Sequence, residues 1–285
     1  MSLVGLVVHN ERPVARELAV AVAEWLVGEG HHVRVPASDA DAIERLERWS
    51  IPEGELASGL DVAVSIGGDG TMLRAVRLVC EEGTPVLGIN VGHLGYLTEV
   101  EPALWKDAMV RVLAGDHLVE ERMTLCVEVL HADGQASAIH TALNDAVVEK
   151  LEAGHTVRVA VTISGRPAIS YATDALIVAT PTGSTAYNLS AGGPLVSPRL
   201  EALVVTPVAP HSLFGRALIV APDEIVDIEI VAGRSVIGVD GRHLGFLQAG
   251  DVVRCKAGPR PARLVTFAER EFWRILKTKF GLNGL

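Results

Sequence analysis

The first 113 residues alternate between short apolar runs of strand length and longer segments with apolar side chains at helical spacing. The first helix is expected to take Asn10 as its cap and Pro13 in its first turn, and to end near Gly28 or Gly30. Strands that alternate with helices predict an α/β domain with a parallel, Rossmann-like sheet covered on both faces. The apolar runs are residues 3–8, 32–35, 61–66 and 85–90, and the other helical segments are residues 39–49, 72–80 and 101–113.

The pattern changes near residue 118, where short strand-like runs follow one another with few helices between them. Such a series predicts an all-β second domain of the β-sandwich type. A closing helix is expected at 267–280. We therefore expect an α/β domain over 1–118, completed by a C-terminal helix over 268–285, and an all-β domain over 119–267. The strand-like runs are residues 125–130, 138–148, 157–164, 168–171, 203–208, 217–220, 225–231, 236–239 and 252–255.

Composition restricts the possible partners and the compartment. The net charge of −10 argues against broad binding to nucleic acid or to an anionic membrane, although it leaves room for a small anionic ligand. Three cysteines lie far apart and match no metal or disulfide pattern, so we expect buried thiols in a reducing compartment. The N-terminal residues have the pattern of a first strand, and no apolar run approaches the ~20 residues that span a bilayer. We expect a soluble cytoplasmic protein.

Residues 174–194 combine a strand, a hydroxyl-rich turn and the start of a helix. Pro181 and Gly183 end the apolar run, and Ser184 and Thr185 are good helix N-cap residues. Free backbone N–H groups at a helix N-terminus, with the hydroxyls of Thr182, Ser184 and Thr185 beside them, would form a place for an anion. A capped turn without a ligand is the alternative interpretation.

A second turn, Gly67-Gly68-Asp69-Gly70-Thr71, follows the third predicted strand. In an open parallel sheet, ligands bind beyond the carboxyl ends of the strands. Glycines around one carboxylate allow a ligand to approach the backbone closely, and the sequence matches neither a Walker loop nor the GxGxxG fingerprint. A carboxylate beside phosphate-binding amides suits phosphoryl transfer. The alternative is a tight strand–helix turn with Asp69 or Thr71 as a cap.

Together with Asn144-Asp145 and residues 88–97, 174–194 and 207–213, this turn resembles the bacterial NAD kinase family. The resemblance covers nearly the whole chain. Similar turns occur in diacylglycerol-type lipid kinases and phosphofructokinases, so the stretch 181–194 is the more specific signature. The resemblance implies transfer of a phosphoryl group from ATP, or in some members from inorganic polyphosphate, to the 2′-hydroxyl of the adenosine ribose of NAD.

The resemblance also implies roles for individual residues. Asp69 is the expected catalytic carboxylate. Magnesium is expected to bridge the donor phosphates, with no ligand residues assigned, and the all-β domain is expected to bind nucleotide. Phosphate-binding residues are expected at Gly67, Gly68 and Thr71, and substrate- or nucleotide-binding residues at Gly70, Arg74, Asn144, Asp145, His155, Asp174, Thr185, Ala186, Tyr187, Asn188, Leu189, Ser190 and Arg242.

Several of these residues also have an interpretation without a ligand. Arg74 could be a solvated surface charge, and Asn144-Asp145 could form a β-turn. His155 could have a structural role, and Tyr187 could fill the core instead of stacking on a base or ribose.

The chain departs from the family pattern at four positions. Asp174-Ala175 replaces the usual Asp-Gly, and Asp145 stands where Glu is frequent. Arg242 stands where Gln is common, and Ala172 where some members have Lys. These differences leave open the preferred donor, the acceptance of NADH and the turnover.

Three other functions compete with an NAD kinase. The negative net charge and the lack of a basic amphipathic stretch argue against a lipid kinase. The presence of Asp69 argues against a non-catalytic NAD(P)-binding regulatory protein. A sugar kinase of the phosphofructokinase type leaves residues 181–194 unexplained. The resemblance further implies a homodimer or homotetramer whose partners are small-molecule nucleotides, and it leaves allosteric regulation open.

Overall fold

A computed structural model describes residues 1–92, 95–269 and 272–280. The chain divides into two compact units, and we treat each by itself. Unit 1 comprises residues 1–121 and 262–285, and unit 2 comprises residues 122–261. In the described part of the chain, no helix is both long and apolar enough to cross a membrane.

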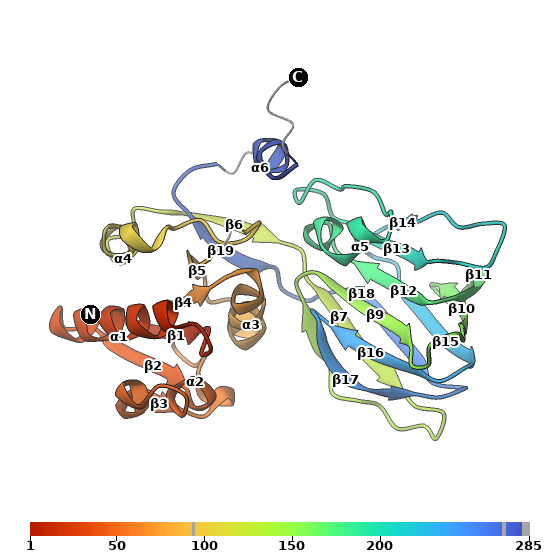
Figure 1. Ribbon diagram of the computed structural model, residues 1–285, viewed down its shortest axis with the longest axis horizontal. Coiled ribbons are helices and arrows are strands. Elements are labelled where there is room, and N and C mark those ends of the chain that lie inside the picture. Colours follow the sequence, from red (N-terminus) through yellow and green to blue (C-terminus); the bar gives the residue numbers. More distant parts are fainter. Residues whose placement is uncertain (93–94, 270–271, 281–285) are drawn as a thin grey trace. The chain divides into compact units, whose positions relative to one another are not determined.

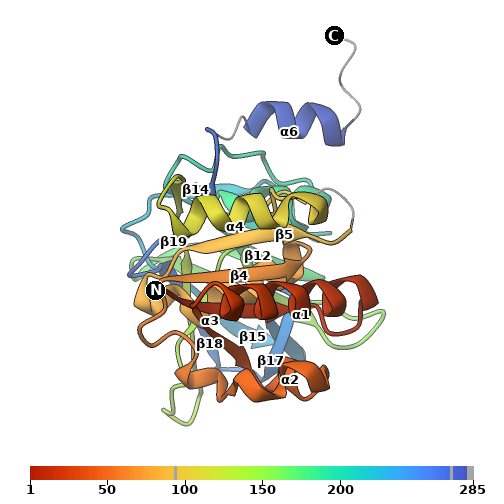
Figure 2. The same cartoon turned by 90° about the vertical axis from the view of Figure 1, so that its left-hand side faces the viewer.

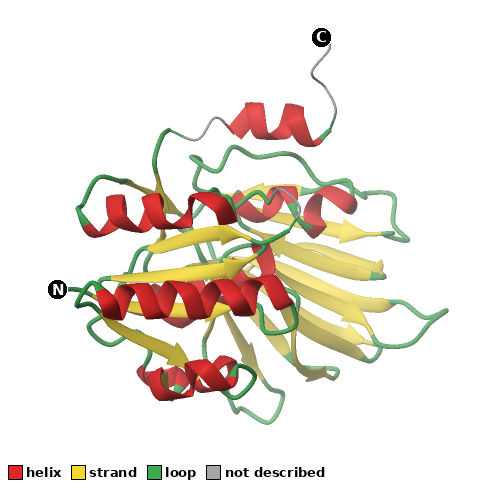
Figure 3. Cartoon of the chain, turned by 60° about the vertical axis from the view of Figure 1, so that its left-hand side comes forward, coloured by secondary structure: helices red, strands yellow, loops and turns green. Residues whose placement is uncertain are grey.

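Unit 1 contains a sheet with the strand order β3-β2-β1-β4-β5-β19-β6. The pairs β2–β3, β1–β2, β1–β4, β4–β5 and β5–β19 are parallel, which confirms the predicted α/β class. Figures 1 and 3 show the strands of this sheet side by side, with helices packed along them. The strands are β1 (Leu3–Val8), β2 (His32–Pro36), β3 (Ser50–Ile51), β4 (Val62–Gly67), β5 (Val86–Asn90), β6 (Leu118–Arg122) and β19 (Ala262–Thr266).

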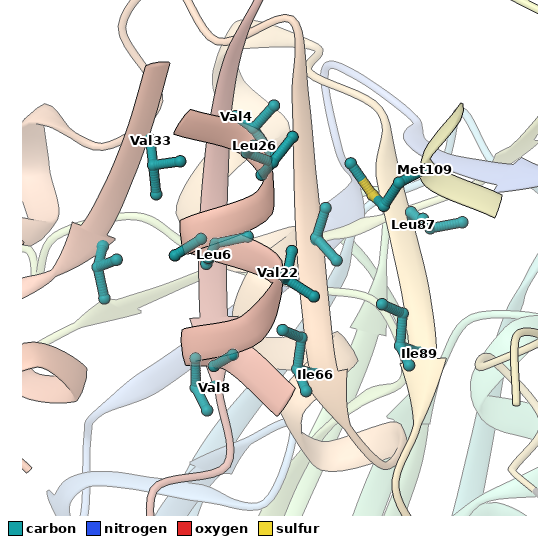
Figure 4. Close-up of a cluster of buried hydrophobic side chains, with 14 of the residues drawn as sticks. Val4, Leu6, Val8, Val22, Leu26, Val33, Ile66, Leu87, Ile89 and Met109 are labelled. Atoms are coloured by element: carbon teal, nitrogen blue, oxygen red, sulfur yellow. The ribbon is translucent and has the colours of Figure 1, made fainter. Parts of the chain in front are cut away.

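Apolar side chains explain why these segments form a sheet. All six residues of β4 are buried, as expected for a strand covered on both faces. Figure 4 shows Val22 and Leu26 of the first helix among the side chains of β1 and β4, with Met109 near the side chains of β5. Figure 2 shows this helix lying along the sheet. The helices of unit 1 are α1 (Pro13–Gly28), α2 (Ala37–Ala40), α3 (Asp69–Val79), α4 (Trp105–Leu113) and α6 (Phe272–Lys279).

Three helical predictions in unit 1 differ from the structure. The N-cap of α1 is Arg12 and not Asn10, and within the described residues no side chain caps this helix by a hydrogen bond. The helix expected over 39–49 is replaced by α2 and a 3₁₀ helix at Glu44–Trp49. The helix expected from residue 72 begins three residues earlier, at Asp69, because the glycine-rich turn is itself the first helical turn.

The return of the chain to unit 1 also differs from the expected position. The sequence pattern assigned residues up to 267 to the second domain, but β19 pairs with β5 of unit 1 through Leu264 and Val86. Of the helix expected over 267–280, the structure describes α6, and the rest of the expected segment 268–285 lies partly outside the described residues.

Unit 2 contains two antiparallel sheets, with strand orders β11-β10-β15-β18-β7-β8 and β14-β13-β12-β9-β16-β17. Buried side chains from both sheets form one apolar cluster, which confirms the predicted all-β class. The first sheet contains β7 (Leu125–Leu130), β8 (His140–Ala142), β10 (Val157–Ile163), β11 (Arg166–Thr173), β15 (Val226–Ala232) and β18 (Val252–Ala257). The second contains β9 (Asp145–Lys150), β12 (Ala175–Ala179), β13 (Leu203–Val208), β14 (Leu218–Val220), β16 (Ser235–Val239) and β17 (Arg242–Leu247).

The prediction of a single strand over residues 138–148 is wrong. This segment forms two strands, β8 and β9, which belong to different sheets. The break falls at Leu143 and Asn144, where both backbone N–H groups donate to the carboxylate of Asp240 at 2.8 Å instead of to a neighbouring strand. Apolar alternation continues across this break, so the pattern alone did not reveal it.

The helix expected after Ser184 is a 3₁₀ helix at Thr182–Thr185 followed by the short helix α5 (Tyr187–Ser190). The predicted caps are wrong, because the hydroxyls point back into the protein. Ser184 is fully buried and its hydroxyl donates to the Pro181 carbonyl at 2.7 Å, while Thr185 donates to the Thr182 carbonyl at 3.1 Å. These hydroxyls stabilise the turn and are not available to an anion.

A buried carboxylate in unit 1 supports the most direct stability prediction. Asp39 is fully buried, accepts the Val8 N–H at 2.9 Å and pairs with Arg74 at 2.6 Å. Asp39→Ala should lower the free energy of unfolding by about 3 kcal/mol, because it leaves a partly buried guanidinium and a backbone N–H without this acceptor. Urea unfolding followed by circular dichroism measures this change. The exposed Asp41→Ala is the control, with a change within about 0.5 kcal/mol; equal effects of the two would contradict the assignment.

Candidate active site

The carboxyl ends of β1 and β4 lie side by side in unit 1, because the chain runs from β1 to β2 on one side and returns to β4 on the other. Such a reversal of strand order opens a crevice where ligands bind in α/β sheets. The structure has a cavity of about 450 Å³ at this position. Its walls are Val8, His9, Asn10, Arg12, Gly68, Asp69, Gly70, Thr71, Arg74 and Gly95.

Asp69 is the first residue of α3, directly after the Gly68 cap. One carboxylate oxygen accepts the backbone N–H of Tyr96 at 2.8 Å, and the other accepts that of Leu97 at 3.0 Å. A negative charge in the first turn of a helix is favourable, because the N-terminal end of the helix dipole is positive. The carboxylate is therefore fixed between α3 and the loop that follows β5, with its position set by backbone atoms.

Gly95 makes this arrangement sterically possible. A Cβ atom at this position would collide with the Oδ1 atom of Asp69 and would lie 2.8 Å from the Oγ1 atom of Thr98. The glycine thus allows the loop after β5 to approach the carboxylate closely enough for its N–H groups to bond. Residues 93 and 94 of the expected motif 88–97 lie outside the described residues.

The first turn of α3 also offers backbone donors. The first N–H groups of any α-helix have no acceptor within the helix, and here this end of α3 lines the cavity. Such an end can bind phosphate oxygens. Of the three predicted phosphate-binding residues, Gly68 and Thr71 lie in the cavity wall, whereas Gly67 is the buried last residue of β4.

Arg74 lines the cavity, but its guanidinium is already bound to the protein. It donates to Asp39 at 2.6 Å, to Ser38 at 2.7 Å and to Glu53 at 3.0 Å. Although burial opposes it, bonding to Asp39 and Glu53 raises the pKa of Arg74 above its usual value. Burial raises the pKa of Asp39, and the Val8 N–H and Arg74 oppose this effect. Arg74 is thus held by two carboxylates at the edge of the cavity.

In unit 2, Asp240 fixes the Asn144–Asp145 pair. Its carboxylate accepts the backbone N–H groups of Leu143, Asn144 and Asp145 at 2.8, 2.8 and 3.2 Å. Asp240 and Gly241 both have positive φ angles, 49° and 73°, and form the tight turn between β16 and β17. Asn144 and Asp145 therefore do not form a simple β-turn. They lie where the chain passes from one sheet to the other, and the carboxylate of Asp240 holds them there.

Three carboxylates of unit 2 lie near Tyr187. Burial raises the pKa of Tyr187, and the charges of Glu149, Asp174 and Asp145 raise it further. Asp174 pairs with Lys150 at 2.7 Å. Asp145 is 5% exposed, and burial together with the charge of Asp240 raises its pKa to about 7. The structure therefore brings together three predicted nucleotide-binding residues: Asp145, Asp174 and Tyr187.

The remaining predicted residues of unit 2 differ in how they are held. Asn188 is fully buried, and its amide bonds to Ser184, Pro194 and Thr206. It therefore fixes the shape of the 184–194 segment and presents no free group. Its neighbours in this segment are Thr185, Ala186, Leu189 and Ser190. His155 and Arg242 are exposed, the first in the loop before β10 and the second at the start of β17.

Two family models cover most of the chain. The ATP-NAD kinase N-terminal domain matches residues 4–117, and the ATP-NAD kinase C-terminal domain matches residues 143–267. The chain belongs to the ATP-NAD kinase family. The family predicted from the sequence is thereby confirmed, together with the NAD kinase class of enzyme.

Individual relatives agree with this family. The NAD kinase of Heliobacterium modesticaldum is 39% identical over 98% of both chains, and that of Symbiobacterium thermophilum is 40% identical over 96% of this chain and 97% of its own. A crystal structure of yeast NADH kinase complexed with NADH matches all of this chain and 89% of its own, with a TM-score of 0.92 and 25% identity. An Archaeoglobus fulgidus NAD kinase in complex with ATP shares the fold, with a TM-score of 0.73, 24% identity and 99% coverage of both chains.

Sequence reasoning about this ATP-NAD kinase family member missed Asp240, Gly95 and Arg12. The Asp-Gly pair between two apolar runs was a signal for a tight hairpin, but not for a carboxylate that reaches residues 143–145. Gly95 was part of a recognised motif without an assigned contact. Arg12 follows the first strand, and only the strand order brings it into the wall of the cavity that contains Asp69.

Gly95→Ala tests the close approach between the loop and the carboxylate. The added methyl group should displace Asp69 and lower the kcat for NADP formation about 10- to 100-fold, the loss expected when a catalytic group is misplaced by about 1 Å. Gly28→Ala is the matched control, because a Cβ atom there meets nothing within 4 Å. Normal kcat in Gly95→Ala would contradict the assigned contact.

The raised pKa of Asp145 predicts a dependence of stability on pH. Folded Asp145 keeps its proton up to about pH 7, whereas the unfolded residue loses it near 3.8. The native state therefore loses stability as pH rises from about 4 to 7, and this loss persists above pH 7. Asp145→Asn should raise the free energy of unfolding at pH 8 by about 2 kcal/mol more than at pH 5, in urea titrations. The exposed Asp223→Asn should show no such difference; a flat profile for both variants would contradict the prediction.

Proposed function

We propose that this kinase transfers the terminal phosphoryl group of ATP to the 2′-hydroxyl of the adenosine ribose of NAD, giving NADP and ADP. The observation that carries the proposal is the Asp69 carboxylate, held by two backbone N–H groups in the cavity wall beside the first turn of α3. Phosphoryl transfer depends mainly on positioning and charge stabilisation, and this geometry supplies a fixed carboxylate and backbone donors.

Asp69 would orient the attacking hydroxyl. Each of its oxygens accepts one N–H and retains capacity for a second hydrogen bond, so one oxygen can accept from the 2′-hydroxyl without losing its support. A carboxylate is a weak base at neutral pH. In a loose transition state the proton leaves late, so orientation of the hydroxyl contributes more than early removal of its proton. The amides of Gly68 and Gly70 would bind phosphate oxygens, whereas the Thr71 N–H already donates to the Gly68 carbonyl at 3.1 Å.

In unit 2, we assign binding of NAD to the residues gathered around Tyr187. Asn144 can donate and accept hydrogen bonds, and Asp145, with a pKa of about 7, can do either according to its protonation state. Asp174 and Tyr187 lie beside them, and the exposed phenol ring is available for stacking. We also assign contacts with the nucleotide to Thr185, Ala186, Leu189, Ser190, His155, Arg242 and Arg74, with Asn188 supporting the segment.

We propose that magnesium arrives with the donor phosphates. Mg²⁺ commonly binds through one or two carboxylates together with phosphates and water. The described residues contain no cluster of three or more candidate metal ligands, which fits a metal held largely by the phosphates. Asp69 fits as a protein group beside such a metal, because its oxygens have remaining lone pairs. The metal would neutralise charge on the donor.

The expected compartment and assembly also belong to this proposal. The cysteines Cys80, Cys126 and Cys255 are all buried and unbridged, which supports a reducing compartment such as the cytoplasm. We propose a homodimer or homotetramer on the family resemblance, and sedimentation of the purified protein distinguishes these from a monomer.

The proposal is tested by NADP formation from NAD and magnesium, with ATP and polyphosphate compared as donors. Asp69→Asn should bind NAD with an affinity close to that of the wild type and lose at least about 100-fold in kcat, because an amide cannot take the proton and aligns the hydroxyl poorly. Binding of NAD is measured by calorimetry in the same preparations.

Three results would contradict this proposal. Near-normal turnover by Asp69→Asn would remove the role given to Asp69. Absence of NADP with either donor, while NADP still binds the wild-type protein, would identify a binding protein instead of a kinase. Phosphorylation of a diacylglycerol in vesicles, without phosphorylation of NAD, would identify a lipid kinase.

A further inference from the structure

The cavity beside Asp69 has two arginines in its wall, Arg12 and Arg74, and they differ in their partners. Arg74 is neutralised by Asp39 and Glu53 at 2.6 and 3.0 Å. Within the described residues, Arg12 forms no ion pair with a carboxylate. A phosphate group that enters this cavity therefore meets a guanidinium that is not already paired with an acid, and that guanidinium belongs to Arg12.

Backbone atoms fix Arg12 across the crevice. The residue is the N-cap of α1, in the loop that follows β1, and its Nη1 atom donates a hydrogen bond to the Val91 carbonyl beyond the end of β5. The Val91 N–H in turn donates to the carbonyl of Gly67 at 2.7 Å, at the end of β4. The side chain therefore spans from the end of β1 to the loop after β5, in the wall of the cavity that contains Asp69.

Gly92 supports this placement. A Cβ atom on Gly92 would collide with the Nη1 atom of Arg12, so the absence of a side chain makes room for the guanidinium. One N–H of the guanidinium is used by Val91. Arginine has five N–H donors in a planar fork, so donors remain for the oxygens of a phosphate.

The position of Arg12 is electrostatically unfavourable without an anion. A cation at the N-terminus of a helix faces the positive end of the helix dipole, and the first turn of α1 contains no acidic residue that would offset it. The N-terminus of α3 adds a second positive end to the same cavity. The positive charge of Arg12 and the two helix N-termini together favour binding of a multiply charged anion in this cavity.

We propose that Arg12 binds the phosphate tail of the nucleotide donor and stabilises the phosphoryl group during its transfer. This inference rests on the proposed kinase function. The transferred phosphorus must lie next to the hydroxyl that Asp69 orients, and Arg12 and the first-turn amides of α3 line the same cavity. NAD also carries phosphates, but they are attached at the 5′ side of the ribose, away from the hydroxyl that reacts. The donor is therefore the ligand that we assign to Arg12.

The experiment compares Arg12→Gln with Arg16→Gln. Glutamine keeps a polar N–H group on a side chain that is two bonds shorter, and it removes the positive charge. Arg16 lies one turn further along α1, is exposed, bonds to the Ala42 carbonyl at 2.8 Å and does not line the cavity, so its variant is the matched control. Thermal unfolding checks that both variants fold as the wild type does.

Arg12→Gln should raise the KM for ATP about 10- to 100-fold, as expected for loss of a charge-assisted hydrogen bond, and should lower kcat as well. The KM for NAD should stay within about twofold, and Arg16→Gln should match the wild type in every parameter. Arg12→Lys should recover part of the loss, because a point charge replaces the planar fork. Calorimetric titration with ATP should show the same loss of affinity without turnover.

The outcomes separate this inference from the proposed function. Wild-type protein that makes no NADP would overturn the kinase proposal itself. Active wild-type protein with an unchanged KM for ATP in Arg12→Gln would overturn only the role of Arg12. An increase in the KM for NAD equal to or larger than that for ATP would also overturn it, since Arg12 would then bind the acceptor.

Discussion

The pair of hydrogen bonds from the Tyr96 and Leu97 N–H groups to Asp69 determines the geometry of the candidate active site. These bonds join the first turn of α3 to the loop after β5, two segments that the parallel sheet already brings to one edge. Because backbone atoms hold the carboxylate, its orientation does not depend on the rotamer of a flexible partner. A site built in this way is ready for a ligand before the ligand arrives, which is the condition for catalysis by positioning.

Unit 2 uses the same physical device. Asp240 accepts three backbone N–H groups at residues 143–145 and so fixes the point where the chain passes from one sheet to the other. The consequence differs from that at Asp69. At Asp69 the carboxylate is itself the proposed functional group, whereas Asp240 holds residues 143–145 in place and adds to the effect of burial, which raises the pKa of Asp145. In both units a carboxylate replaces a missing strand partner at a place where regular pairing ends.

Much of this could be predicted from the sequence. Apolar periodicity gave the α/β and all-β classes, and the stretch 181–194, together with the turn at 67–71 and the other matching segments, led to the family. The errors occurred where a side chain from a distant segment decides local structure. Asp240 divides the expected strand 138–148, and Ser184 turns its hydroxyl inward to Pro181. The salt bridge that holds Arg74 was not predicted either, because its partner Asp39 is 35 residues away in the sequence. Local patterns contain no information on such partners.

The central claim is that Asp69 meets the ribose hydroxyl that receives the phosphate. A crystal structure of the protein with NAD and a β,γ-imido analogue of ATP tests it most directly. The account predicts an Asp69 carboxylate oxygen at about 2.6–3.2 Å from the 2′-oxygen of the adenosine ribose, while the N–H bonds from Tyr96 and Leu97 remain. A 2′-oxygen beyond hydrogen-bonding distance of Asp69, with the analogue phosphates bound elsewhere, would contradict it.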